Sequence, residues 1–156
     1  MDWNIVRNKE DVARLLARVE GFHDWYVAGF SYDPLAQSED DDLNLGRFKV
    51  DVDALTITFR WDSKSKSGKW PEVQLEFRNL SEFHFGNFRD PDPIWNGVLE
   101  ETRKGWVFVD DDGETLSEEE RAHPETIRSS LLVICGEIRW RPLAVVTTDG
   151  PDWWNN

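Results

Sequence analysis

The sequence predicts a single α+β domain over residues 1–156, with a mainly antiparallel sheet and an N-terminal helix packed on one face. Helical spacing of apolar residues is clear only near the N-terminus, whereas most of the remaining chain alternates apolar and polar residues as strands do. The chain has the length of one domain, and it contains no internal repeat and no linker rich in Gly, Ser or Pro. We expect about five to seven strands.

The helix is predicted over Lys9–Glu20. Asn8 precedes it as a suitable N-cap, and Gly21 follows at the position where helices often end in glycine. Its apolar stripe comprises Val12, Leu15, Leu16 and Val19, at the i, i+3, i+4 and i+7 spacing of one helix face.

Strands are predicted downstream of this helix. Gly29 indicates a bulge in the first of them, and a change of apolar phase near Asp53 indicates a turn or a second irregularity. A polar hairpin loop is predicted over 63–69, an acidic loop over 34–42, a helix or turn over 94–104, and a capping box at Ser117. The predicted strands cover 22–32, 47–61, 73–77 with Phe83 and Phe85, 106–109, 131–135 and 137–140, with the last pair central in the sheet.

The charge balance restricts the partners. Eighteen basic and 31 acidic residues give a net charge of −13, which repels nucleic-acid phosphates and anionic lipid. We therefore expect no nucleic-acid or membrane partner, whereas a basic protein, a cation or a neutral ligand remains compatible. The single cysteine, Cys135, and the absence of a signal-peptide pattern or a long apolar run predict a cytoplasmic protein.

Motifs for catalysis and metal binding are sparse. His23 and Asp24 are weak catalytic candidates, because an imidazole beside a carboxylate can act as a base with its orienting group. Neighbours on a strand point to opposite faces, so the alternative is that Asp24 caps local backbone and His23 lies at a sheet edge. No histidine pair has metal-ligand spacing, and no acidic run matches a calcium loop. We expect no metal and no cofactor, and whether the protein is an enzyme stays open.

Acidic runs and terminal tryptophans are the better candidates for a binding surface. Clustered carboxylates attract a basic partner, and an exposed indole is a strong anchor for a protein or a stacking platform for a sugar. The alternative is that the terminal indoles cover an edge of the core. The candidate partner-binding residues are Glu39, Asp40, Asp41, Asp42, Asp110, Asp111, Asp112, Trp153 and Trp154.

The string Phe22-His23-Asp24 follows the predicted helix, and strands then lead to Val73-x-Leu75-x-Phe77-x-Asn79-Leu80. In these features the first half of the chain resembles small bacterial α+β immunity proteins of polymorphic toxin systems. The resemblance implies a protein that binds and blocks a cognate toxin, and it implies no catalytic residue.

The hypothesis from sequence is a non-enzymatic acidic protein that occludes a basic partner. Two alternatives stay open. One is a carbohydrate or small-ligand binding module that uses tryptophan platforms, and the other is a hydrolase built around His23 and Asp24.

Overall fold

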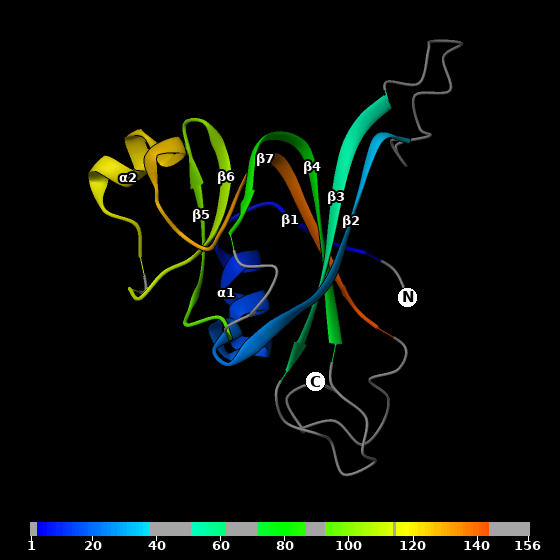
Figure 1. The fold of residues 1–156 in the computed structure, drawn as a ribbon, viewed down its shortest axis with the longest axis horizontal. Helices are drawn as coiled ribbons and strands as arrows, with labels where there is room; N and C mark the ends of the chain where they lie inside the picture. The colour runs from blue at the N-terminus through cyan, green and yellow to red at the C-terminus, as the bar shows by residue number, and fades with distance from the viewer. Residues whose placement is uncertain (1–2, 38–50, 62–71, 87–92, 114, 144–156) are drawn as a thin grey trace.

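A computed structural model describes residues 3–37, 51–61, 72–86, 93–113 and 115–143. Seven strands, two α-helices and two short 3₁₀ helices make up the described residues (Figure 1). In chain order they are β1 (Asn4–Val6), α1 (Lys9–Arg18), η1 (Glu20–Phe22), β2 (Trp25–Gln37), β3 (Asp51–Trp61), β4 (Glu72–Phe85), β5 (Gly97–Thr102), β6 (Gly105–Asp110), α2 (Glu118–Ala122), η3 (Pro124–Thr126) and β7 (Leu131–Pro142).

The strands form one antiparallel sheet in the order β2-β3-β4-β7-β6-β5, and β1 pairs with the end of β7. This confirms the predicted α+β class. The long strands β4 and β7 join the two halves of the sheet. β4 pairs with β7 along nearly its whole length, and its first part also pairs with β3, whereas the start of β7 also pairs with β6. Figure 1 shows the strong curvature of β4. Within this strand Asn79 has φ 55°, and the register with β7 shifts between Leu80 and Glu82.

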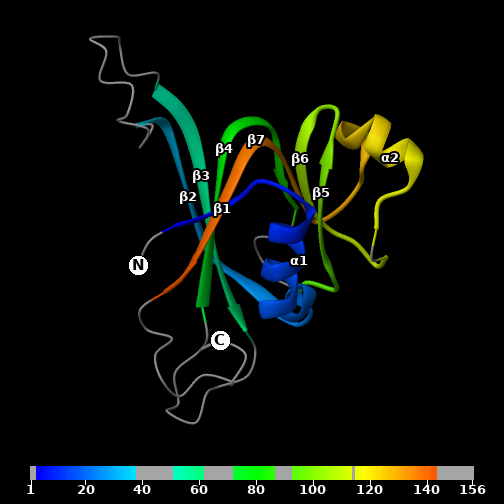
Figure 2. The same cartoon turned by 180° about the vertical axis from the view of Figure 1, so that it is seen from behind.

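The N-terminal helix begins as predicted, because the Asn8 side chain accepts a hydrogen bond from the amide of Asp11. It ends at Arg18, two residues before the predicted end. Gly21 has φ 64° and belongs to η1, so the chain leaves the helix through left-handed backbone. The helix lies against the sheet beside β5 and β1 (Figures 1 and 2), and the apolar residues Val12, Leu15 and Val19 are buried. Within the described ranges no helix is long and apolar enough to cross a membrane.

Large rings occupy the centre of the core. We call Phe22, Trp25, Phe59 and Phe108 the inner aromatic cluster; all four are fully buried. Phe22 contacts the other three rings at centroid distances of 4.9–5.8 Å. Edge-to-face and tilted contacts at this distance add about 0.5–1.5 kcal/mol per pair beyond the burial of apolar area.

A smaller apolar cluster covers the opposite face of β6 and β7, under the segment that contains α2. The strands in this half are therefore buried on both faces, which explains the continuous apolar run around Cys135 and confirms the central place of β7. Burial also raises the pKa of the Cys135 thiol to about 12. The cluster consists of Val98, Val107, Val109, Leu116, Leu132 and Ile134.

Several predicted boundaries are wrong. The segment predicted as a helix or turn over 94–104 contains β5, which forms a hairpin with β6 and buries Val98 and Leu99. Leu131–Cys135 and Glu137–Trp140 form one strand, because Gly136 continues β7 past Asn79 and makes no turn. β1 was not predicted.

Other sequence predictions hold or lie outside the described residues. Strand β2 continues through Pro34 to Gln37, as an edge strand tolerates, so the acidic loop predicted over 34–42 is wrong at residues 34–37, and its residues 38–42 lie outside the described residues. Register shifts next to Gly29 and opposite Asp53 confirm the two predicted irregularities, although β3 passes through Asp53 without a turn. The capping box at Ser117 is present. The polar hairpin loop over 63–69 lies outside the described residues.

Candidate functional site

The most exposed large apolar side chain of the described residues is Trp95, with 67% of its surface accessible. It lies in the segment that leads into β5. Hydrogen bonds connect this segment to the turn between α1 and β2 and to the end of β6. We call this group the Trp95 site; it consists of Trp95, His23, Asp24, Asp110, Asp111 and Asp112.

Polar contacts hold the backbone of Trp95 on both sides of the residue. Its amide donates to Oδ1 of Asp110 at 2.9 Å, and its carbonyl lies 2.6 Å from Nδ1 of His23. Asn96 follows, and its carbonyl accepts from the amide of Asp111 at 3.0 Å. Hydrogen bonds on both peptide groups thus fix the backbone that carries the indole, while the ring itself stays mostly in solvent.

The preceding residue, Ile94, connects the site to the core. Its amide donates to the carbonyl of Trp25 at 2.8 Å, and its carbonyl accepts from the amide of Asp24 at 3.0 Å. Ile94 itself is buried. The segment that presents Trp95 is therefore attached directly to the inner aromatic cluster through Trp25.

The turn that carries His23 has an unusual backbone. Glu20, Phe22 and Asp24 have φ values of 48°, 60° and 63°, in the left-handed region that favours glycine. Each such residue costs about 1–3 kcal/mol, and such strain is concentrated at functional sites. Burial of Phe22 among the rings of the inner cluster holds the turn in this conformation. No local sequence pattern predicted it.

Aspartates occur in each of the segments that hold the Trp95 backbone. Asp24 and Asp112 are exposed, whereas Asp110 and Asp111 are partly buried. Burial raises the pKa of Asp110, and the amides of Trp95 and Asn96 oppose this effect by stabilising the carboxylate. The site thus combines one apolar anchor with four acidic groups.

The structure brings the two weak catalytic candidates within 3.6 Å, between Nε2 of His23 and Oδ2 of Asp24. Both side chains are about half exposed, at 52% and 59%. A carbonyl only accepts hydrogen bonds, so Nδ1 of His23 carries the proton donated to Trp95. In the neutral ring Nε2 then presents a lone pair to the carboxylate, whereas an orienting carboxylate accepts a hydrogen bond from the N–H group of its base. This geometry supports a positioning role for His23.

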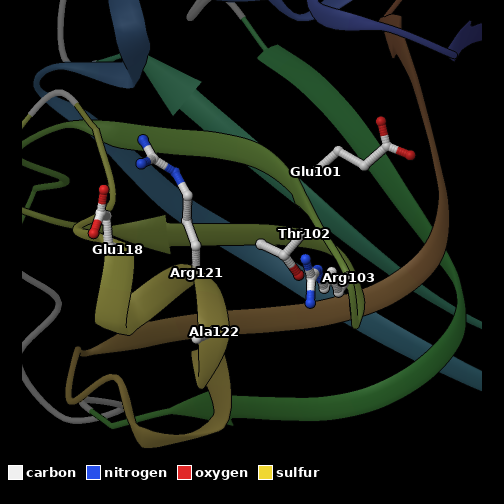
Figure 3. Close-up of a pocket in the computed structure, with 6 residues that line it drawn as sticks. All are labelled: Glu101, Thr102, Arg103, Glu118, Arg121 and Ala122. Carbon is white, nitrogen blue, oxygen red and sulfur yellow. The ribbon is translucent and has the colours of Figure 1, made fainter.

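A pocket of about 540 Å³ lies between the tip of the β5–β6 hairpin and α2 (Figure 3). Figure 3 shows the side chain of Glu101 directed away from Arg121, and Arg121 pairs with Glu100 at 2.9 Å. Its two acidic and two basic side chains balance and do not converge on one point. The lining residues are Glu101, Thr102, Arg103, Glu118, Arg121 and Ala122.

Among the residues that the structure describes, no group of three or more His, Cys, Asp or Glu side chains is placed to hold a metal ion. Of the predicted partner-binding residues, Asp110, Asp111 and Asp112 belong to the Trp95 site. The other six, Glu39, Asp40, Asp41, Asp42, Trp153 and Trp154, lie outside the described residues. Trp95 was not among the predicted site residues.

No family model, no curated protein and no solved structure matches this chain. Function is therefore inferred from the geometry of the site.

Proposed function

We propose that this chain is a non-enzymatic binding protein that docks a basic partner protein through the Trp95 site. The observation that carries the proposal is an indole that is 67% exposed while its amide and carbonyl groups are both bonded. Trp is prominent among the residues that dominate binding energy at interfaces. A residue held in place before binding loses less conformational freedom when the partner arrives.

The charge of the site supports the choice of partner. Asp110 accepts from the amide of Trp95, three further aspartates lie in the segments that hold the Trp95 backbone, and the whole chain carries a net charge of −13. A basic surface is attracted to such a site, and this attraction raises the association rate at low salt and weakens as salt screens it. Apolar contact with the indole is less sensitive to salt, so it accounts for the residual affinity at high salt.

The resemblance to toxin-immunity proteins suggests the kind of partner. It rests in part on Phe22-His23-Asp24, which here form the turn that holds the Trp95 segment. In a toxin-immunity role, a basic toxin surface docks on Trp95 and the aspartates, and the bound protein blocks access to that surface.

The test begins with capture of partners from the native organism by the purified protein, followed by identification and purification of each partner. Affinity is then measured by calorimetry for the wild type, Trp95→Ala and a matched control, Tyr32→Ala. Tyr32 is also an exposed aromatic, at 55%, but it lies on β2 and its hydroxyl donates to Asp53. We expect Trp95→Ala to weaken binding by about 30-fold or more and Tyr32→Ala to have little effect.

Three outcomes would contradict the proposal: an acidic partner, equal binding by Trp95→Ala and the wild type, or affinity that does not change between roughly 0.05 M and 0.5 M salt. Salt-independent binding of a neutral oligosaccharide that requires Trp95 would instead support the carbohydrate-binding alternative. Hydrolysis of a partner or ligand that is lost in His23→Ala would support the hydrolase.

A further inference from the structure

We propose that β2 docks a short, extended, basic segment of another protein, which adds to the sheet as a further strand. Among the described residues β2 pairs only with β3, and it forms one edge of the sheet (Figure 1). An edge strand leaves the N–H and C=O groups of alternate residues directed away from the sheet, where another strand can bond to them. This mode of recognition does not depend on the Trp95 site.

The regular part of this edge is short. Register shifts occur next to Gly29 and after Asp33, and between them residues 29–33 pair with β3 in unbroken register. We call residues 29–33 the β2 edge. The irregularities on both sides, together with Pro34, which has no N–H group, limit the pairing of a new strand beyond this segment. The β2 edge therefore fits a short extended peptide better than a long strand.

One face of the β2 edge presents two aromatic rings. Phe30 and Tyr32 are 45% and 55% exposed. Their register partners on β3 are Ile57 and Leu55, which are buried in the core. The apolar face of the sheet thus continues to its edge and is accessible there. Alternate side chains of an added strand would lie beside these two rings, where aromatic and β-branched neighbours stabilise strand pairing.

Contacts with β3 and β4 hold both rings in place. Phe30 packs edge-to-face against Phe83 of β4, at a centroid distance of 5.9 Å. The hydroxyl of Tyr32 donates to Oδ2 of Asp53 at 3.2 Å. Oδ1 of Asp53 in turn accepts from the amide of Leu80 on β4 at 3.1 Å. Because both rings have partners before a strand arrives, they lose less conformational freedom when it binds.

The charge at the β2 edge favours a basic segment. Asp33 follows Tyr32 on the edge itself, and the carboxylate of Asp53 bonds to the Tyr32 hydroxyl. β2 contains no Lys or Arg, although the whole chain has 18 such residues. A second copy of this chain carries the same net charge of −13 and is repelled, whereas the Lys or Arg side chains of a basic segment are attracted.

The probe is a peptide of alternating Lys and Val residues, about seven residues long and blocked at both ends. Two control peptides each change one property: one has Glu in place of Lys, and the other has every backbone amide methylated and therefore cannot donate to a strand. Binding is followed on the full chain by NMR of backbone amides and by calorimetry. The variant is Tyr32→Ala, and the matched control is Trp95→Ala, which removes an exposed aromatic outside β2. Thermal unfolding verifies that both variants are folded.

We expect the Lys–Val peptide to bind saturably, with amide shifts concentrated at residues 29–33, and neither control peptide to produce these shifts. Tyr32→Ala should weaken binding by about fivefold or more, and Trp95→Ala should leave it unchanged, which is the reverse of their effects on a partner that docks on Trp95.

The proposal is overturned by the absence of saturable shifts at the β2 edge, by equal affinity of either control peptide or of Tyr32→Ala, or by weaker binding to Trp95→Ala. It is also overturned by concentration-dependent shifts of the same amides without peptide, because these would assign the edge to a second copy of this chain.

Discussion

The inner aromatic cluster and Trp95 are direct neighbours, yet different forces hold them. Phe22, Trp25, Phe59 and Phe108 have no accessible surface, and contacts between their rings fix them. The ring of Trp95 lies mostly in solvent, and hydrogen bonds fix the backbone that carries it. Packing therefore stabilises the fold in one region, whereas in the other polar contacts keep an apolar side chain available to a partner.

The largest expected effect separates the two regions by stability. Phe108→Ala removes a ring that contacts both Phe22 and Phe59, and we expect it to lower the free energy of unfolding by about 3–5 kcal/mol. Trp95→Ala removes a mostly solvated ring and should cost less than about 0.5 kcal/mol. Urea denaturation of both variants tests the contrast. Similar losses would show that the indole of Trp95 is part of the core.

A second substitution tests how tightly the cluster is packed. A Cβ atom at Gly97 would lie 2.8 Å from Cδ2 of Phe22 and 3.2 Å from Cε2 of Phe108. We expect Gly97→Ala to destabilise the protein by about 1–3 kcal/mol through overpacking. Gly29→Ala is the control, because nothing lies within 4 Å of a Cβ atom there. If both alanines have the same effect in urea denaturation, the cluster is loosely packed.

The third prediction concerns the hydrogen bonds at Trp95. Asp110→Ala removes the acceptor for the amides of Trp95 and Asn96, and we expect a loss of about 1 kcal/mol. The larger consequence is motion of the Trp95 backbone on the ps–ns timescale, seen as lower NMR order parameters at Trp95 and Asn96. Order parameters equal to those of the wild type would mean that His23 and Ile94 alone suffice to hold the segment.

The smallest effect is a dependence on pH. Burial raises the pKa of Asp110 above its ordinary value of 3.8, so the folded protein keeps this proton at a pH where the unfolded chain has lost it. The contribution of Asp110 to stability is therefore complete below pH 3.8, the ordinary pKa of the group, and it is lost as pH rises through the raised pKa of the folded protein. Asp110→Asn retains an acceptor oxygen and does not titrate. In urea denaturation at several pH values, the wild type should lose stability relative to this variant as pH rises above 3.8; a constant difference would contradict the raised pKa.

Local sequence patterns predicted those helices and strands whose position depends on their own residues. The apolar stripe and the Asn8 cap located the start of α1, and the alternation at Val73, Leu75 and Phe77 located β4. β5 was missed because Val98 and Leu99 are adjacent and buried on both faces, so no alternation marks them. A break between two strands was predicted at Gly136. The glycine instead allows a close approach to Asn79, which depends on pairing between strands that are distant in the sequence and therefore could not be predicted.

The Trp95 site was only half predictable. Three consecutive aspartates are visible in the sequence, and so is the Phe-His-Asp string. That these two segments meet at Trp95 depends on hydrogen bonds that span 15 residues to Asp110 and 72 residues to His23. No residue near Trp95 in the sequence indicates either partner. Six of the nine predicted partner-binding residues lie outside the described residues, so for them the prediction stays a prediction.

The passage of β4 and β7 through both halves of the sheet has a consequence for how the molecule opens. The β2–β3 part of the sheet is joined to β4 and the β6–β5 part to β7, so the two parts stay connected while β4 and β7 stay paired. Backbone amides in the middle of β7 should therefore exchange with deuterium only when the whole domain unfolds, and their exchange rates should report its global stability directly.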